Sequence, residues 1–103
     1  MPEKYIKDGK VAILVSPGYG AGWSTWEKAE LSYDRRIVKK FLEGASADEM
    51  SLYLNSIGYD HVYMGGYRQL TVVWLPVGTK YIIEEYDGSE CLRTVNDFNW
   101  KTA

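Results

Sequence analysis

Five consecutive apolar residues at positions 11–15, Val-Ala-Ile-Leu-Val, place the strongest constraint on the fold. The run is short for a helix and rich in β-branched residues, so it predicts a β-strand. Because no polar residue alternates with the apolar ones, both faces of this strand must be covered by other parts of the chain. The strand is therefore predicted to lie in the middle of a sheet.

Two short helices are predicted to follow this strand. Asp34 is a favourable N-cap for a helix that ends near Leu42, and Ser46 with Glu49 has the pattern of a capping box. In each helix the apolar residues recur at a spacing that places them on one face. These residues are Ile37, Val38, Phe41 and Leu42 in the first helix, and Met50, Tyr53, Leu54 and Ile57 in the second.

Residues that favour strands dominate the C-terminal half. Residues 70–75 and 81–86 are predicted to pair as a hairpin around a turn at 76–79, and residues 61–64 and 91–95 to add short strands. Phe98 and Trp100 are predicted to fold back over the domain. The 103 residues are thus expected to form a single domain of the α+β class. It would have a mainly antiparallel sheet of four to five strands, with the two short helices on one face.

Charge and cysteine content argue against several functional classes. The formal net charge of −2 lacks the basic excess of a general nucleic-acid binder, so direct nucleic-acid binding is not expected. The single cysteine, Cys91, indicates a reducing, cytoplasmic setting and is interpreted as a small buried apolar residue. The polar N-terminal residues do not resemble a signal peptide, and no apolar run approaches the ~20 residues that span a membrane.

Residues 16–26 combine three glycines, a proline and three aromatic residues in one loop. Glycine lets backbone amides approach an anion closely, and aromatic rings stack on flat ligands. The spacing differs from the Walker A and dinucleotide-binding patterns, so the loop is a candidate ligand site of another kind. The alternatives are a tight loop that covers one edge of the sheet and a contact surface for a partner protein.

A basic helix face follows the loop and completes the candidate site. Arg35, Arg36, Lys39 and Lys40 would bind phosphates or an acidic partner, or simply face solvent. If this face and the loop meet in space, they form a site for an anionic, aromatic ligand such as a nucleotide. The residues assigned to the candidate site are Ser16, Gly18, Tyr19, Gly20, Gly22, Trp23, Ser24, Trp26, Arg35 and Arg36.

The sequence holds no recognisable catalytic or metal-binding pattern. The acidic residues Glu84, Glu85, Asp87 and Glu90 offer carboxylates for acid–base chemistry, but neighbours on a strand point to opposite faces. His61 is the one histidine, and its surroundings in the sequence match no catalytic triad or zinc pattern. No cofactor, metal ion or catalytic residue is therefore assigned.

Three segments carry a resemblance to a known group of proteins. They are Ser-Pro-Gly-Tyr-Gly-Ala-Gly-Trp-Ser-Thr-Trp at 16–26, Leu-Pro-Val-Gly-Thr-Lys at 75–80 and Glu-Tyr-Asp-Gly-Ser-Glu at 85–90. Over most of its length the chain resembles short proteins found in bacterial viruses, prophages and other mobile elements. The resemblance transfers no functional residues, but it implies the setting of a viral accessory protein that counters host defences.

The predicted function is that of a small binding protein without enzymatic activity, which counteracts a host defence system in the host cytoplasm. Its partner would be a host protein that it blocks or a nucleotide-like signal that it sequesters. Two alternatives stay open: a small hydrolase that uses acidic residues of the C-terminal strand, and a structural or assembly protein of a phage. Assembly into a homo-oligomer also stays open.

Overall fold

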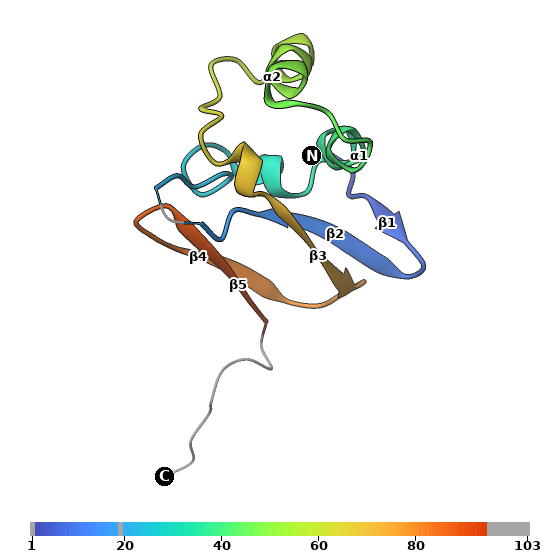
Figure 1. The fold of residues 1–103 in the computed structure, drawn as a ribbon. Helices are drawn as coiled ribbons and strands as arrows, with labels where there is room; N and C mark the ends of the chain where they lie inside the picture. Colours follow the sequence, from blue (N-terminus) through green and yellow to red (C-terminus); the bar gives the residue numbers. More distant parts are fainter. Residues whose placement is uncertain (1, 19, 95–103) are drawn as a thin grey trace.

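The strands form two antiparallel sheets rather than the single sheet expected from the sequence (Figure 1). The computed structural model describes residues 2–18 and 20–94. One sheet has the strand order β1-β2-β3, and β4 pairs with β5 in the other. The strands are β1 (Ile6–Lys7), β2 (Lys10–Val15), β3 (Thr71–Pro76), β4 (Tyr81–Tyr86) and β5 (Ser89–Thr94). The helices are α1 (Arg35–Leu42) and α2 (Ala47–Ser56), with short 3-10 helices η1 (Ala29–Ser32) and η2 (Tyr67–Gln69). The fold is α+β, as predicted.

Strand β2 is covered on both faces, as its apolar run predicts. Ala12 and Leu14 belong to a core cluster shared with α1 and α2. Val11, Ile13 and Val15 belong to a second cluster, which side chains of β4 and β5 complete. The molecule therefore has three layers, with both helices on one side of the first sheet and the β4–β5 hairpin on the other (Figure 1).

Both helices begin at the predicted N-caps. The Asp34 side chain accepts a hydrogen bond from the Arg36 amide, and Ser46 and Glu49 form the full capping box. The prediction is wrong for one residue of the apolar face, Leu42, which is 41% exposed. At 3.6 residues per turn, Leu42 lies about 140° around the helix from Ile37, at the margin of the buried face.

The predicted hairpin of residues 70–75 and 81–86 is wrong. β3 pairs with β2, and β4 pairs with β5 so that Ile83 lies opposite Leu92. The turn at 76–79 exists, with the Thr79 amide donating to the Pro76 carbonyl at 3.0 Å, but it carries the chain from one sheet to the other. The hairpin turn lies instead at Asp87-Gly88, between β4 and β5. The φ values of these two residues, 49° and 83°, match those of a two-residue hairpin turn.

Two local predictions are corrected as well. Residues 61–64 form no strand, because the Tyr63 amide donates to the Glu27 carboxylate instead of a neighbouring strand (3.0 Å). Cys91 is exposed rather than buried. Cys91 lies on β5, opposite Glu84 of β4. Its side chain points to the other face of the strand from that of its neighbour Glu90, which is buried. The predicted fold-back of Phe98 and Trp100 lies outside the described residues.

Candidate functional site

A buried carboxylate organises the glycine-aromatic loop, residues 16–26. Glu90 is 2% exposed. Its Oε1 atom accepts a hydrogen bond from the Ser16 amide (2.9 Å). Its Oε2 atom accepts from the Trp23 amide (2.8 Å), the Thr25 amide (3.0 Å) and the Thr25 hydroxyl (2.6 Å). A charge so far from solvent is tolerated because these donors replace its lost hydration.

The loop amides thus bind the carboxylate of Glu90, which belongs to the same chain. The amides of Trp23 and Thr25 belong to the loop that was predicted to approach an external anion, and they donate to Glu90. Trp23 is fully buried, and its indole donates to the Leu31 carbonyl at 2.9 Å. These contacts attach the loop to β5 and η1.

The described loop residues differ in their exposure. Ser16, Gly22, Trp23 and Ser24 are buried, Gly18 is half-buried, and Gly20 and Trp26 are exposed. Tyr19 lies outside the described residues. Of the aromatic residues assigned to the candidate site and described by the structure, only Trp26 therefore offers its ring to solvent.

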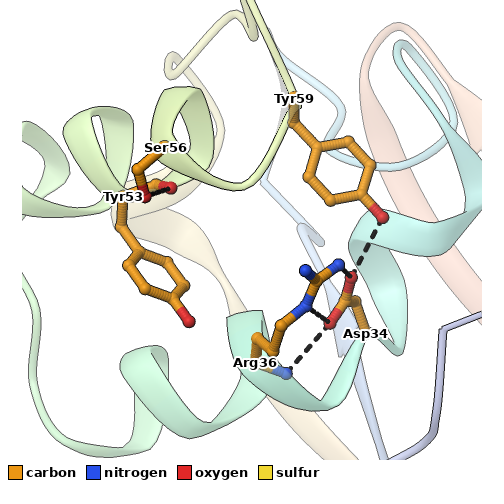
Figure 2. A network of polar contacts seen from close by, with 5 residues as sticks. All are labelled: Asp34, Arg36, Tyr53, Ser56 and Tyr59. Carbon is orange, nitrogen blue, oxygen red and sulfur yellow. Dashed lines mark hydrogen bonds and ion pairs between the residues drawn. The ribbon is translucent and has the colours of Figure 1, made fainter.

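The two assigned arginines are the first residues of α1, which follows a second buried carboxylate, Asp34. Figure 2 shows Arg36 at this carboxylate. Asp34 is 1% exposed and receives a bidentate ion pair from Arg36, with Nε at 3.1 Å from Oδ1 and an η-nitrogen at 2.7 Å from Oδ2. The Tyr59 hydroxyl donates to Oδ2 at 3.0 Å. Arg35 instead contacts Glu3 at 3.4 Å, and both of those side chains are largely exposed.

This network shifts the ionisation of its members. Burial alone would raise the pKa of Asp34, but hydrogen bonds from Arg36 and Tyr59 outweigh burial and hold that pKa below its ordinary value. Burial, followed by the hydrogen bond to Asp34, raises the pKa of the Tyr59 phenol to about 12. At neutral pH the network therefore consists of a carboxylate, a guanidinium and a neutral phenol.

Two cavities share Pro2, Glu3 and Arg35 in their lining. The first, which we name the tyrosine cleft, has a volume of about 890 Å³ and is lined by residues 2–6 with Tyr33, Arg35 and Tyr81. The second, the arginine cleft, has a volume of about 530 Å³ and adds Asp34, Arg36, Lys39 and Tyr53 to the shared residues. Figure 2 shows Tyr53 on α2 beside Arg36.

Loop residues line a different cavity from the arginines. Ser24 and Thr25 border a hollow of about 420 Å³ together with Tyr33 and Tyr81. The expected meeting of loop and basic helix face is therefore indirect, because the same two tyrosines border both this hollow and the tyrosine cleft. The assignment of the loop to ligand binding stays a prediction.

Sequence reasoning missed the tyrosines of the clefts and the role of Glu90. Tyr5, Tyr33 and Tyr81 come from three separate parts of the chain, and no periodic pattern connects them. Glu90 was grouped with its acidic neighbours, and no predicted strand included it, so no local signal distinguished it from Glu84, Glu85 and Asp87.

Comparisons with protein-family models, curated proteins and solved structures found no match. Within residues 2–18 and 20–94, no group of three His, Cys, Asp or Glu side chains is placed to hold a metal ion. In the same part of the chain, no helix has the length and apolar character needed to cross a membrane.

Proposed function

We propose that this protein is a non-enzymatic binding protein of viral or mobile-element type, which counteracts a host defence by sequestering a nucleotide-like signal in the host cytoplasm. The observation that carries the proposal is the position of Arg35, which lines both the tyrosine cleft and the arginine cleft. A ring in the first cleft and a phosphate at Arg35 would together use the two kinds of contact that a nucleotide offers.

The chemistry of the clefts supports an anionic aromatic ligand. Their volumes fall in the range of about 300–1,000 Å³ that small-molecule sites occupy. Tyrosine rings stack on bases, at roughly 1–3 kcal/mol per base. Guanidinium groups match phosphate oxygens in geometry as well as charge.

Two cations of the clefts, Arg35 and Lys39, remain available to a ligand. The Arg35 side chain pairs with Glu3 at 3.4 Å, both side chains are exposed, and such pairs contribute at most about 1 kcal/mol. Among the described residues Lys39 has no ion-pair partner. A phosphate can therefore replace Glu3 at little cost.

The acidic residues of the C-terminal hairpin favour binding over hydrolysis. Glu84 forms an ion pair with Arg93. Glu85 accepts hydrogen bonds from the Trp26 indole and the Gly88 amide. Glu90 is buried among loop amides. Each of these three glutamates is thus engaged in a contact within the fold.

Ligand-induced stabilisation tests the proposal. Adenosine and guanosine monophosphates are added to the full chain, with adenosine and inorganic phosphate as half-ligands. At a hundred times the dissociation constant, binding stabilises the native state by about 2.7 kcal/mol. For a domain of this size, that raises the melting temperature by on the order of 10 °C.

The matched variants are Arg35→Ala and Arg68→Ala. Arg68 is also exposed but borders a different cavity, beside the start of α2. Arg35→Ala is expected to weaken nucleotide binding tenfold or more, because a charge-assisted hydrogen bond contributes about 1.5–3 kcal/mol. Arg68→Ala should leave it unchanged. No change in melting temperature with any nucleotide at millimolar concentration would exclude the proposed function.

A further inference from the structure

Two aromatic rings and two carboxylates form an exposed surface next to the C-terminal end of the glycine-aromatic loop. Trp26 and Tyr63 stack with ring centroids 6.1 Å apart and planes inclined by 27°. Their exposed fractions are 43% and 56%. We name this surface, made of Trp26, Glu27, Tyr63 and Glu85, the aromatic-acidic patch.

Both rings of the patch lie close to the backbone of a glycine. A Cβ atom at Gly22 would come within 2.8 Å of the Trp26 Cδ1 atom, and a Cβ atom at Gly65 would overlap the Tyr63 ring. Each ring therefore lies directly against the backbone of a glycine. A ring that packs against backbone loses less conformational entropy when a partner binds than a freely rotating side chain does.

Hydrogen bonds fix the two carboxylates beside the rings. The Trp26 indole donates to Glu85 Oε1 at 3.1 Å, and the Gly88 amide donates to the same atom at 2.7 Å. The Tyr63 amide donates to Glu27 Oε1 at 3.0 Å. The Oε2 atom of each carboxylate has no hydrogen-bond or ion-pair partner among residues 2–18 and 20–94.

The patch therefore combines two ring faces with two uncompensated negative charges. A cation over the face of Trp or Tyr is attracted by the ring quadrupole. An arginine side chain adds planar stacking and several N–H donors for carboxylate oxygens. The open, half-exposed rings suit a side chain that projects from a larger partner.

We propose that the aromatic-acidic patch binds an arginine-bearing segment of a partner protein. The guanidinium would lie against the exposed faces of Trp26 and Tyr63 and donate to the free oxygens of Glu27 and Glu85. This surface is separate from the two clefts and does not depend on nucleotide binding. It would allow the same small domain to block a host protein.

The test uses a tetra-arginine peptide and its citrulline counterpart, which keeps the shape and removes the charge. Binding is followed by the NMR signal of the Trp26 indole N–H, assigned with Trp26→Phe. The arginine peptide is expected to shift that signal and to bind at least about tenfold more tightly than the citrulline peptide. Raising the salt concentration should weaken binding, because the charges lie at the surface.

Variants separate the patch from general attraction to an acidic protein. Glu27→Gln with Glu85→Gln removes both charges but keeps acceptors for the Trp26 and Tyr63 donors. Binding should fall about tenfold. The matched control is the double variant Asp48→Asn with Asp60→Asn, two exposed acids elsewhere on the surface, which should leave binding unchanged.

Three results would overturn the proposal. The first is equal binding of the arginine and citrulline peptides. The second is equal loss of binding in the patch variant and in the control variant. The third is a dimer in sedimentation that Trp26→Ala converts to monomer, since the patch would then be an interface between two copies.

Discussion

The Asp34 side chain joins the start of α1 to the segment that follows α2. It caps α1, pairs with Arg36, and accepts the hydroxyl hydrogen of Tyr59, which follows α2. Because the carboxylate is 1% exposed, its charge is compensated only by these donors. The contacts of this residue should therefore dominate the dependence of stability on pH.

We expect the Asp34–Tyr59 pair to affect stability at both ends of the pH range. The pKa of Asp34 is lowered on folding, so its contribution is present above the ordinary carboxyl pKa and is lost as pH falls through the lowered value. The pKa of Tyr59 is raised, so its contribution is present below 10 and is lost as pH rises towards about 12. Urea unfolding between about pH 3 and pH 12 measures both.

Two variants assign these effects. Asp34→Asn should remove most of the acid-side loss and cost about 2–4 kcal/mol at neutral pH, because it disrupts the hydrogen bonds that a buried carboxylate accepts from the half-exposed Arg36 and from Tyr59. Tyr59→Phe should reduce the alkaline loss alone. A wild-type alkaline limb that Tyr59→Phe leaves unaltered would show that Asp34 and Tyr59 are not coupled in this way.

The role of a residue could be predicted from the sequence where it depends on residues close by in the chain. The caps Asp34 and Ser46 precede their helices directly, so the sequence identified both correctly. Glu90 contacts Ser16, Trp23 and Thr25 across 65 to 74 positions of sequence. A charged residue is ordinarily exposed, and no local pattern indicates that distant amides will enclose it.

At the scale of elements, the Glu90 carboxylate connects the glycine-aromatic loop to β5 through four hydrogen bonds. Glu90→Ala leaves three amides and a hydroxyl without their acceptor. We expect a loss of at least about 3 kcal/mol in urea unfolding, because each buried unsatisfied group costs about 1–3 kcal/mol. Glu84→Ala, which breaks an exposed ion pair, is the control and should cost less than about 1 kcal/mol.

A milder variant keeps this expectation testable if Glu90→Ala does not fold. Glu90→Gln retains an acceptor oxygen and should be less destabilising. Hydrogen exchange at the Trp23 and Thr25 amides should accelerate in this variant, while exchange in α2 changes only with global stability. Unchanged protection of both amides would mean that the loop is held by other contacts.

Two Asp-Gly turns offer a matched comparison between backbone strain and close packing. Gly9 and Gly88 have similar φ values, 75° and 83°, and each follows an aspartate that also has positive φ. A Cβ atom at Gly9 would meet nothing within 4 Å, whereas one at Gly88 would lie 2.5 Å from the Ala21 nitrogen. Both substitutions cause strain, but only the second displaces the glycine-aromatic loop.

Gly9→Ala is expected to cost about 1–2 kcal/mol, the usual penalty for an alanine in the left-handed region. Gly88→Ala should cost at least about 1 kcal/mol more, since a backbone atom must move to admit the methyl group. Urea unfolding of both variants measures the difference. Equal losses would show that the β4–β5 turn can move away from the loop without cost.

At the scale of the whole molecule, the apolar sequence of β2 predicts that a layer lies on each of its faces. It does not predict which elements form those layers. An apolar run without alternation requires cover on both faces, and this was predicted. Which elements supply the cover depends on strand pairing between distant segments. Residues 70–75 and 81–86 were assigned to each other because they are adjacent in sequence, whereas β3 joins β2 and β4 moves to the outer layer.

Separation along the sequence also limits prediction of the candidate site. Arg35 and Arg36 were identified from their spacing on a helix, and both line a cleft. The tyrosine cleft is assembled from the N-terminal segment, the residue before the Asp34 cap and the start of β4. Only the three-layer arrangement brings these three segments together.

Because β2 separates the two core clusters, we expect mutations on its two sides to act independently. Leu54 belongs to the helix-side cluster, and Ile13 and Ile83 belong to the hairpin-side cluster. Leu54→Ala combined with Ile83→Ala should destabilise by the sum of the single losses, within about 0.5 kcal/mol. Ile13→Val combined with Ile83→Ala should depart from the sum by more than that, since the two side chains belong to one cluster.

Urea unfolding of the wild type, the two single variants and the double variant of each cycle provides these values. Each single loss should fall between about 0.5 and 5 kcal/mol, the range for shortened core side chains. A coupling across β2 as large as the coupling within the hairpin-side cluster would mean that the sheet transmits packing changes between the layers. The clefts that border the outer hairpin would then respond to substitutions in α2.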